Sequence, residues 1–114
     1  MKKIKILADE NIGGELLDDV QKILGKKLGI EVIPFPEELR RKSLNDEEIL
    51  DKLKELECDG IVSRDDGMIK RAIERGLKAF WLLGYRHGKV YIVCEVKMIG
   101  GVRISKEYFW NHEE

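Results

Sequence analysis

The chain has 114 residues, 43% of them hydrophobic and 38% charged, which is enough for one domain with its own core. Its 21 Lys and Arg nearly balance its 22 Asp and Glu, so the formal net charge of -1 excludes a general attraction to nucleic acid. The N-terminus becomes acidic after a few apolar residues, which excludes a signal peptide and a membrane span. We therefore expect a single cytoplasmic domain over residues 1–114, with no membrane partner.

The first third of the chain alternates between strand and helix patterns. Residues 4–8 form an apolar run that ends in acidic residues, which predicts a buried strand. Apolar residues then recur at helical spacing over residues 12–28, and a second strand is expected over residues 30–33. The charged segment 37–43 is either a loop or a short surface helix.

The alternation continues through the middle of the chain. Asn45 and Glu48 have the spacing of a capping box, so they predict a helix start. A third strand is expected at residues 61–62, followed by a third helix after residue 65 and a fourth strand over residues 77–83. Cys58 lies between these elements, far from the other cysteine and outside any metal-binding spacing, so we expect two buried free thiols.

Strands that alternate with helices predict a doubly wound α/β fold. We expect a three-layer sandwich with a mainly parallel sheet of four to five strands and crossover helices on both faces. A C-terminal β-hairpin is predicted by the apolar segments 90–98 and 102–104, which flank Gly100 and Gly101. This hairpin either extends the sheet edge or forms a contact in a homodimer.

Acidic residues follow two of the predicted parallel strands. Asp9 comes directly after the first strand, Asp65 comes after the third, and Asp46 opens a helix between them. In doubly wound sheets the ligand site lies at the carboxyl ends of the strands, so these side chains are expected to meet there. Crowded carboxylates repel one another, and a hard cation such as Mg²⁺ or Mn²⁺ relieves that repulsion.

Helix capping is the alternative explanation for most of these acids. Asp and Glu are common in the first turn of any helix because they complement its dipole, and Asp46, Glu47, Asp65 and Asp66 all occupy such positions. Asp9 follows a strand and has no comparable capping role.

The chain resembles PIN-like ribonuclease domains, especially the small prokaryotic toxin-type branch. Three segments match that family in order: residues 6–11 (ILADEN), 45–50 (NDEEIL) and 61–68 (IVSRDDGM). The resemblance covers roughly residues 3–84 and implies a PIN-like fold and a metal-dependent endoribonuclease that uses Mg²⁺ or Mn²⁺. The implied partners are RNA and an antitoxin protein.

The resemblance also assigns roles to individual residues. Asp9, Asp46 and Asp65 would be the catalytic metal ligands, and the fourth acid is either Asp66 or Glu47 because Gly67 stands where many relatives have a second acid.

Three further residues are expected to support these acids. Ser63 and Asn11 would orient the carboxylates by hydrogen bonding, and Arg64 would contact RNA phosphate because it is adjacent to Asp65.

Two other functions remain open at this point. One is a PIN-like binding or interaction protein without catalytic activity. The other is a receiver domain of signalling, which also places acids after its first and third strands. A receiver is the weaker alternative because its phosphoacceptor is usually followed by a Met-Pro-type loop, which is absent after Asp65.

Overall fold

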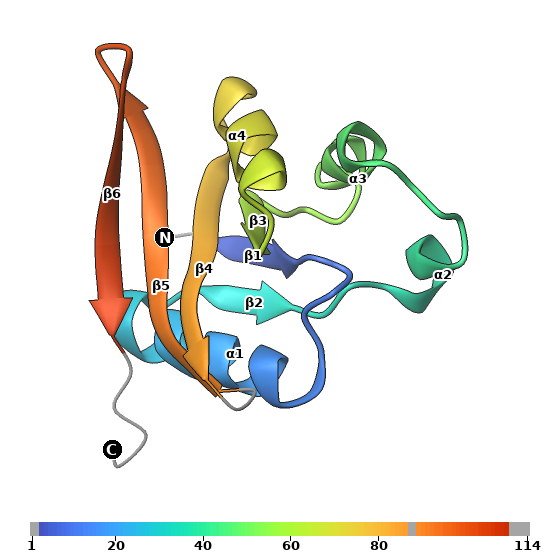
Figure 1. The fold of residues 1–114 in the computed structure, drawn as a ribbon. Coiled ribbons are helices and arrows are strands. Elements are labelled where there is room, and N and C mark those ends of the chain that lie inside the picture. Colours follow the sequence, from blue (N-terminus) through green and yellow to red (C-terminus); the bar gives the residue numbers. More distant parts are fainter. Residues whose placement is uncertain (1–2, 87–88, 110–114) are drawn as a thin grey trace.

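The computed structural model describes residues 3–86 and 89–109, and all six strands within them belong to one sheet (Figure 1). The strand order is β2-β1-β3-β4-β5-β6. The strands are β1 (Lys5–Ala8), β2 (Glu31–Ile33), β3 (Gly60–Ser63), β4 (Lys78–Arg86), β5 (Lys89–Ile99) and β6 (Val102–Phe109). The helices are α1 (Gly14–Leu28), α2 (Glu37–Arg40), α3 (Asp46–Lys52) and α4 (Asp66–Glu74).

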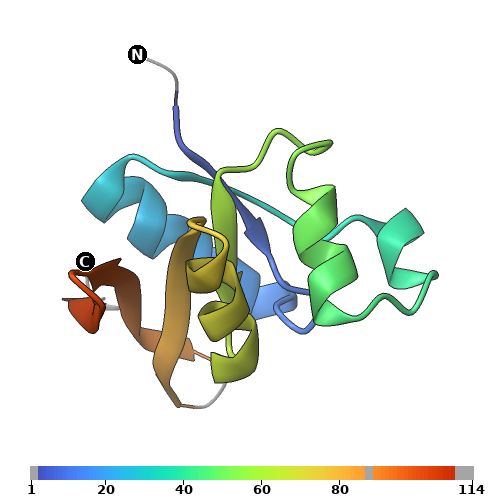
Figure 2. The ribbon, with the colours of Figure 1, turned by 90° about the horizontal axis from the view of Figure 1, so that it is seen from above.

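The first four strands are parallel, and helices cover both faces of this part of the sheet. Strand β1 pairs with β2 and β3, and β3 pairs with β4. Helix α1 lies on one face, while α3 and α4 lie on the other (Figure 2). The predicted α/β class and its layered arrangement are therefore confirmed.

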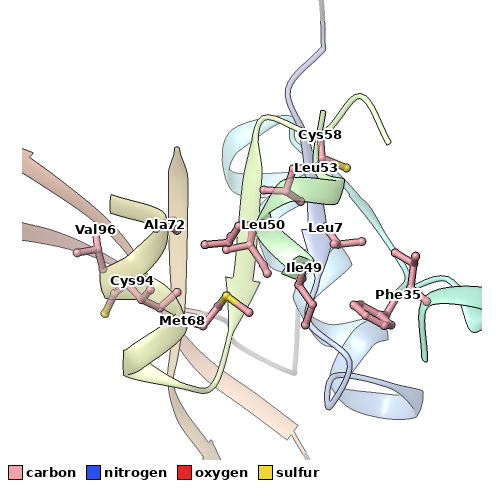
Figure 3. Packing of buried hydrophobic residues seen from close by; sticks show 14 residues of the cluster. Leu7, Phe35, Ile49, Leu50, Leu53, Cys58, Met68, Ala72, Cys94 and Val96 are labelled. Atoms are coloured by element: carbon pink, nitrogen blue, oxygen red, sulfur yellow. The ribbon is translucent and has the colours of Figure 1, made fainter. Parts of the chain in front are cut away.

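Successive residues of each central strand supply two separate cores. In β1, Ile6 and Ala8 pack toward α1, whereas Leu7 packs toward α3 and α4. Figure 3 shows the second core, in which Leu7 lies near Ile49 of α3, and Met68 of α4 completes the cluster. This alternation follows from the two-residue period of a strand, and it holds the ends of β1 and β3 rigidly between two helical layers.

The sheet itself differs from the expected one. It has six strands and is mixed, whereas the prediction was a mainly parallel sheet of four to five strands plus a C-terminal hairpin whose position was left open. The reason is that β4 extends to Arg86, beyond the predicted end at residue 83, and pairs with β5 in antiparallel fashion from Ala79 onward. The C-terminal hairpin therefore extends the sheet edge within one chain.

Several local predictions can be compared with the element boundaries. The capping box is confirmed, because Asn45 accepts a hydrogen bond from the Glu48 N–H at 2.9 Å and the Glu48 side chain accepts from the Asn45 N–H at 3.2 Å. The segment 37–43 contains the short helix α2. Both cysteines, Cys58 and Cys94, are free and buried. In the described part of the chain, no helix is long and apolar enough to cross a membrane.

Candidate functional site

The site lies where the strand order reverses. The chain runs from β1 outward to β2 and then returns to β3 on the other side of β1, so the reversal falls between β1 and β3. Asp9 follows β1, and its backbone N–H donates to the Val62 carbonyl at 3.0 Å, which keeps it beside the end of β3. Ser63 is the last residue of β3, and Asp65 follows two residues later. The predicted meeting point of the two strand ends is thus where the fold places these residues.

Asp9 is a buried carboxylate with fixed orientation. Its side chain is 5% exposed, its Oδ2 accepts a hydrogen bond from Ser63 Oγ at 2.6 Å, and its Oδ1 accepts one from the Glu10 N–H at 2.9 Å. Burial raises the pKa of Asp9, and the two hydrogen bonds only partly offset that effect. The nearby charges of Glu10 and Asp65 raise this pKa further. Asp9 therefore carries its charge at an energetic cost to the fold.

Ser63 connects the two acids that follow the strands. It is fully buried, donates to Asp9, and accepts a hydrogen bond from the Asp65 N–H at 3.0 Å. The predicted orienting role of Ser63 agrees with this geometry. Asp65 caps α4, since its Oδ1 accepts from the Gly67 N–H at 2.9 Å. Asp65 is thus a helix cap and also a charge close enough to Asp9 to affect its pKa.

Asp46 belongs to the same electrostatic group. Partial burial raises its pKa, and the charge of Asp65 adds to this increase, as does that of Asp9. Arg71 of α4 acts in the opposite direction because its Nη1 lies 3.4 Å from Asp46 Oδ2. Asp46 is the first residue of α3 and does not cap it, since Asn45 takes that role. Asp46 is therefore not the N-cap, but as a first-turn acid it still complements the dipole of α3.

The two candidates for a fourth acid are both paired with arginines. Glu47 bonds to Arg75 and lies 3.6 Å from Arg71 Nε, and Asp66 accepts from Arg103 Nη2 at 2.7 Å. These ion pairs join α3 to α4 and α4 to β6. The charges of Asp9, Asp46 and Asp65 influence one another, but Asp46 is also paired with an arginine, as Glu47 and Asp66 are.

The two remaining predicted residues are close to the acids in the sequence. Asn11 is exposed in the turn after β1, and Arg64 is half-buried between Ser63 and Asp65. A surface pocket of about 470 Å³ lies between α3 and α4 and is lined by Asn45, Asp46, Glu47 and Arg71. Asp46 thus borders an opening toward solvent that has Arg71 at its wall.

The carboxylate oxygens of Asp9, Asp46 and Asp65 are the type of ligand that a hard divalent cation prefers, although they do not converge on one point. Within residues 3–86 and 89–109, no three His, Cys, Asp or Glu side chains are arranged as a metal-ion site. Each Asp9 oxygen accepts the hydrogen bond described above and, as a carboxylate oxygen, can accept a second contact. Burial and then the charges of Asp65 and Asp9 raise the pKa of Asp46, and a cation bound among these oxygens would relieve the repulsive part.

Sequence reasoning did not single out the arginines that organise this region. Arg71 lies four residues after Gly67, so helical spacing places it one turn below the start of α4, where it also donates to the Gly67 carbonyl at 3.0 Å. Arg103 reaches Asp66 only because β6 is folded back beside β5, and no local pattern indicates that contact. No protein-family model, curated protein or solved structure matches this chain.

Proposed function

We propose that this protein is a Mg²⁺- or Mn²⁺-dependent endoribonuclease whose site is formed by Asp9, Asp46 and Asp65. The observation that carries the proposal is the buried Asp9 carboxylate, which Ser63 holds at the strand reversal beside two further acids. Carboxylates whose pKa is raised by burial cluster at functional sites. The resemblance of three ordered acidic segments to PIN-like ribonucleases supports the same function.

Each residue has a defined role in this proposal. Asp9, fixed by two hydrogen bonds, supplies preorganised oxygen ligands, while Asp65 and Asp46 supply the more exposed ones. A bound Mg²⁺ or Mn²⁺ provides an activated water and stabilises negative charge on the transferring phosphate. Arg71, at the wall of the pocket, is placed to contact an RNA phosphate, since backbone contacts require only positive charge.

Hydrolysis of single-stranded RNA by the purified chain with Mn²⁺ tests this function. Asp9→Asn and Asp65→Asn are expected to abolish cleavage, whereas Asp18→Asn, an exposed acid of α1, should leave it unchanged. Ser63→Ala should reduce cleavage by about 10- to 100-fold, as is typical for residues that orient metal ligands. If Asp9→Asn and Asp65→Asn both cleave as fast as the unmodified chain, the proposal fails.

A second candidate is a PIN-like binding protein without catalytic activity. It is favoured by the pairing of Glu47 and Asp66 with arginines. Because these are the two candidates for a fourth acidic ligand, Asp9, Asp46 and Asp65 are left without a fourth. Cleavage that is lost both on chelation and in Asp9→Asn would exclude this candidate, because a contaminating nuclease would not respond to the substitution.

A further inference from the structure

Strand β6 forms an exposed outer edge of the sheet (Figure 1). It is eight residues long, and every residue in it except Tyr108 is exposed. An edge strand of this length presents a row of backbone N–H and C=O groups that another strand can pair with. Natural proteins usually shorten, bend or cover such edges, and β6 contains neither Pro nor a register shift against β5.

The hairpin turn determines which backbone groups face outward. Gly100 and Gly101 have φ angles of 57° and 78°, which correspond to a two-residue type I′ turn. The residues flanking such a turn are hydrogen-bonded to each other, and bonded pairs then alternate along the antiparallel ladder. Accordingly Arg103, Ser105 and Glu107 direct their N–H and C=O groups away from β5.

The sequence of β6 is complementary to itself in one antiparallel register. A twofold axis between two antiparallel strands must place one residue opposite its own copy. With Ser105 in that position, Arg103 lies opposite Glu107 of the second copy, and this pair occurs twice. Axes at Arg103, Lys106 or Glu107 would instead place like charges opposite each other.

The same register covers apolar side chains that one chain leaves exposed. Val102 and Ile104 are 61% and 44% exposed, and they would lie opposite Tyr108 and Lys106 of the second copy. Phe109, which is 58% exposed, would cover Gly101 of the other strand. Charge complementarity and apolar burial therefore favour the same arrangement.

We propose that two copies of this chain associate through antiparallel pairing of their β6 strands, with the twofold axis at Ser105. The pairing joins the two six-stranded sheets into one continuous sheet. Arg103 can take part while it keeps its bond to Asp66, because a guanidinium group has five N–H donors. This association is independent of the proposed nuclease activity.

Sedimentation of the full chain tests the association. We expect a species of twice 13.2 kDa that dissociates on dilution. Ser105→Pro should be monomeric, because it removes an outward N–H that the chain does not use in its own ladder, whereas Ser105→Ala should remain dimeric. A chain that stays monomeric up to its highest soluble concentration overturns the proposal and would leave β6 to a strand from another protein. A Ser105→Pro variant that remains dimeric would also overturn the proposal.

Charge exchange tests the register and separates weakened association from misfolding. Glu107→Arg and Arg103→Glu each place like charges opposite one another, so each alone should be monomeric. An equal mixture of these two variants restores opposite charges at both ends and should form a heterodimer. Failure of the mixture to associate, with both variants folded by circular dichroism, would contradict the Ser105 register.

Oxidative cross-linking gives an independent check of the same register. Ser105→Cys should form a disulfide-linked dimer, since directly opposite residues lie within the Cα separation that a disulfide spans. Val102→Cys should not, because the two copies of that residue lie at opposite ends of the paired strands. The native Cys58 and Cys94 are buried, so the unmodified chain measures the background level of cross-linking. Efficient cross-linking of Val102→Cys and none of Ser105→Cys would refute the arrangement.

Discussion

Replacing Ser63 by alanine tests how the site is held together. Ser63 is fully buried, donates to Asp9 at 2.6 Å and accepts from the Asp65 N–H at 3.0 Å, so alanine leaves both groups without this partner. A hydrogen bond to a charged group contributes about 1.5–3 kcal/mol, and an ordinary one contributes about 1 kcal/mol. The substitution should therefore lower the free energy of unfolding at neutral pH by about 2.5–4 kcal/mol.

The size of this loss should depend on pH. The Ser63 hydrogen bond lowers the pKa of Asp9 while burial raises it, so in Ser63→Ala the pKa of Asp9 should rise further. The hydrogen bond is strongest to the ionised carboxylate. The cost of Ser63→Ala is thus greatest at neutral pH and decreases as the pH falls through the raised pKa of Asp9.

Asp9→Asn should change the free energy of unfolding in the opposite direction to Ser63→Ala. Because the pKa of Asp9 in the folded chain lies above 3.8, its charge destabilises the fold at neutral pH, and this penalty is relieved as the pH falls through the raised pKa. Asp9→Asn lacks the charge, so we expect it to be more stable than the unmodified chain at neutral pH. The difference should fade as the pH approaches 3.8.

Urea unfolding of a double-mutant cycle measures these effects. The cycle consists of the unmodified chain, Ser63→Ala, Asp9→Asn and the double variant, and Ser105→Ala serves as an exposed control. We expect a coupling energy between Asp9 and Ser63 of at least about 1 kcal/mol at neutral pH, typical of contacting residues. Strict additivity, or a Ser63→Ala cost no larger than that of Ser105→Ala, would refute the reasoning.

Two further predictions concern residues around the site and in the sheet. Arg71→Ala should raise the pKa of Asp46 in an NMR titration because the nearby positive charge is lost, whereas Arg75→Ala should not, and equal shifts in both would contradict this. Gly60→Ala should cost at least about 3 kcal/mol in thermal or urea unfolding, since its Cβ would lie 1.9 Å from a β4 carbonyl oxygen. Gly25→Ala, inside α1 with ordinary contacts, should instead stabilise the chain by about 0.5–1 kcal/mol. Similar losses of stability at Gly60 and Gly25 would argue against the close approach of β3 to β4.

Local patterns predicted those parts of the fold that depend on local physics. The capping box of α3 and the glycine turn between β5 and β6 each involve residues within a few positions of one another. The placement of Asp9 near Ser63 spans 54 residues, yet it was predictable because the carboxyl ends of neighbouring parallel strands must lie together.

Other features depend on packing that no local pattern specifies. The sequence left the position of the hairpin open, because edge extension and pairing between copies use the same exposed strand. The arginine pairs were likewise missed, since Arg103 and Asp66 lie 37 residues apart on separate elements. These pairs engage both candidates for the fourth acid, Glu47 and Asp66, and the sequence did not indicate them.

A crystal soaked in Mn²⁺ and measured for anomalous scattering tests the central claim most directly. We predict a single strong peak between the Asp9 and Asp65 carboxylates, with Asp46 within reach of the same ion and no peak in Asp9→Asn. The reorientation of Asp46 from Arg71 toward the ion should be visible in the same map. Absence of metal at this position, with the Asp9 and Asp65 carboxylates too far apart to share an ion, would contradict the account.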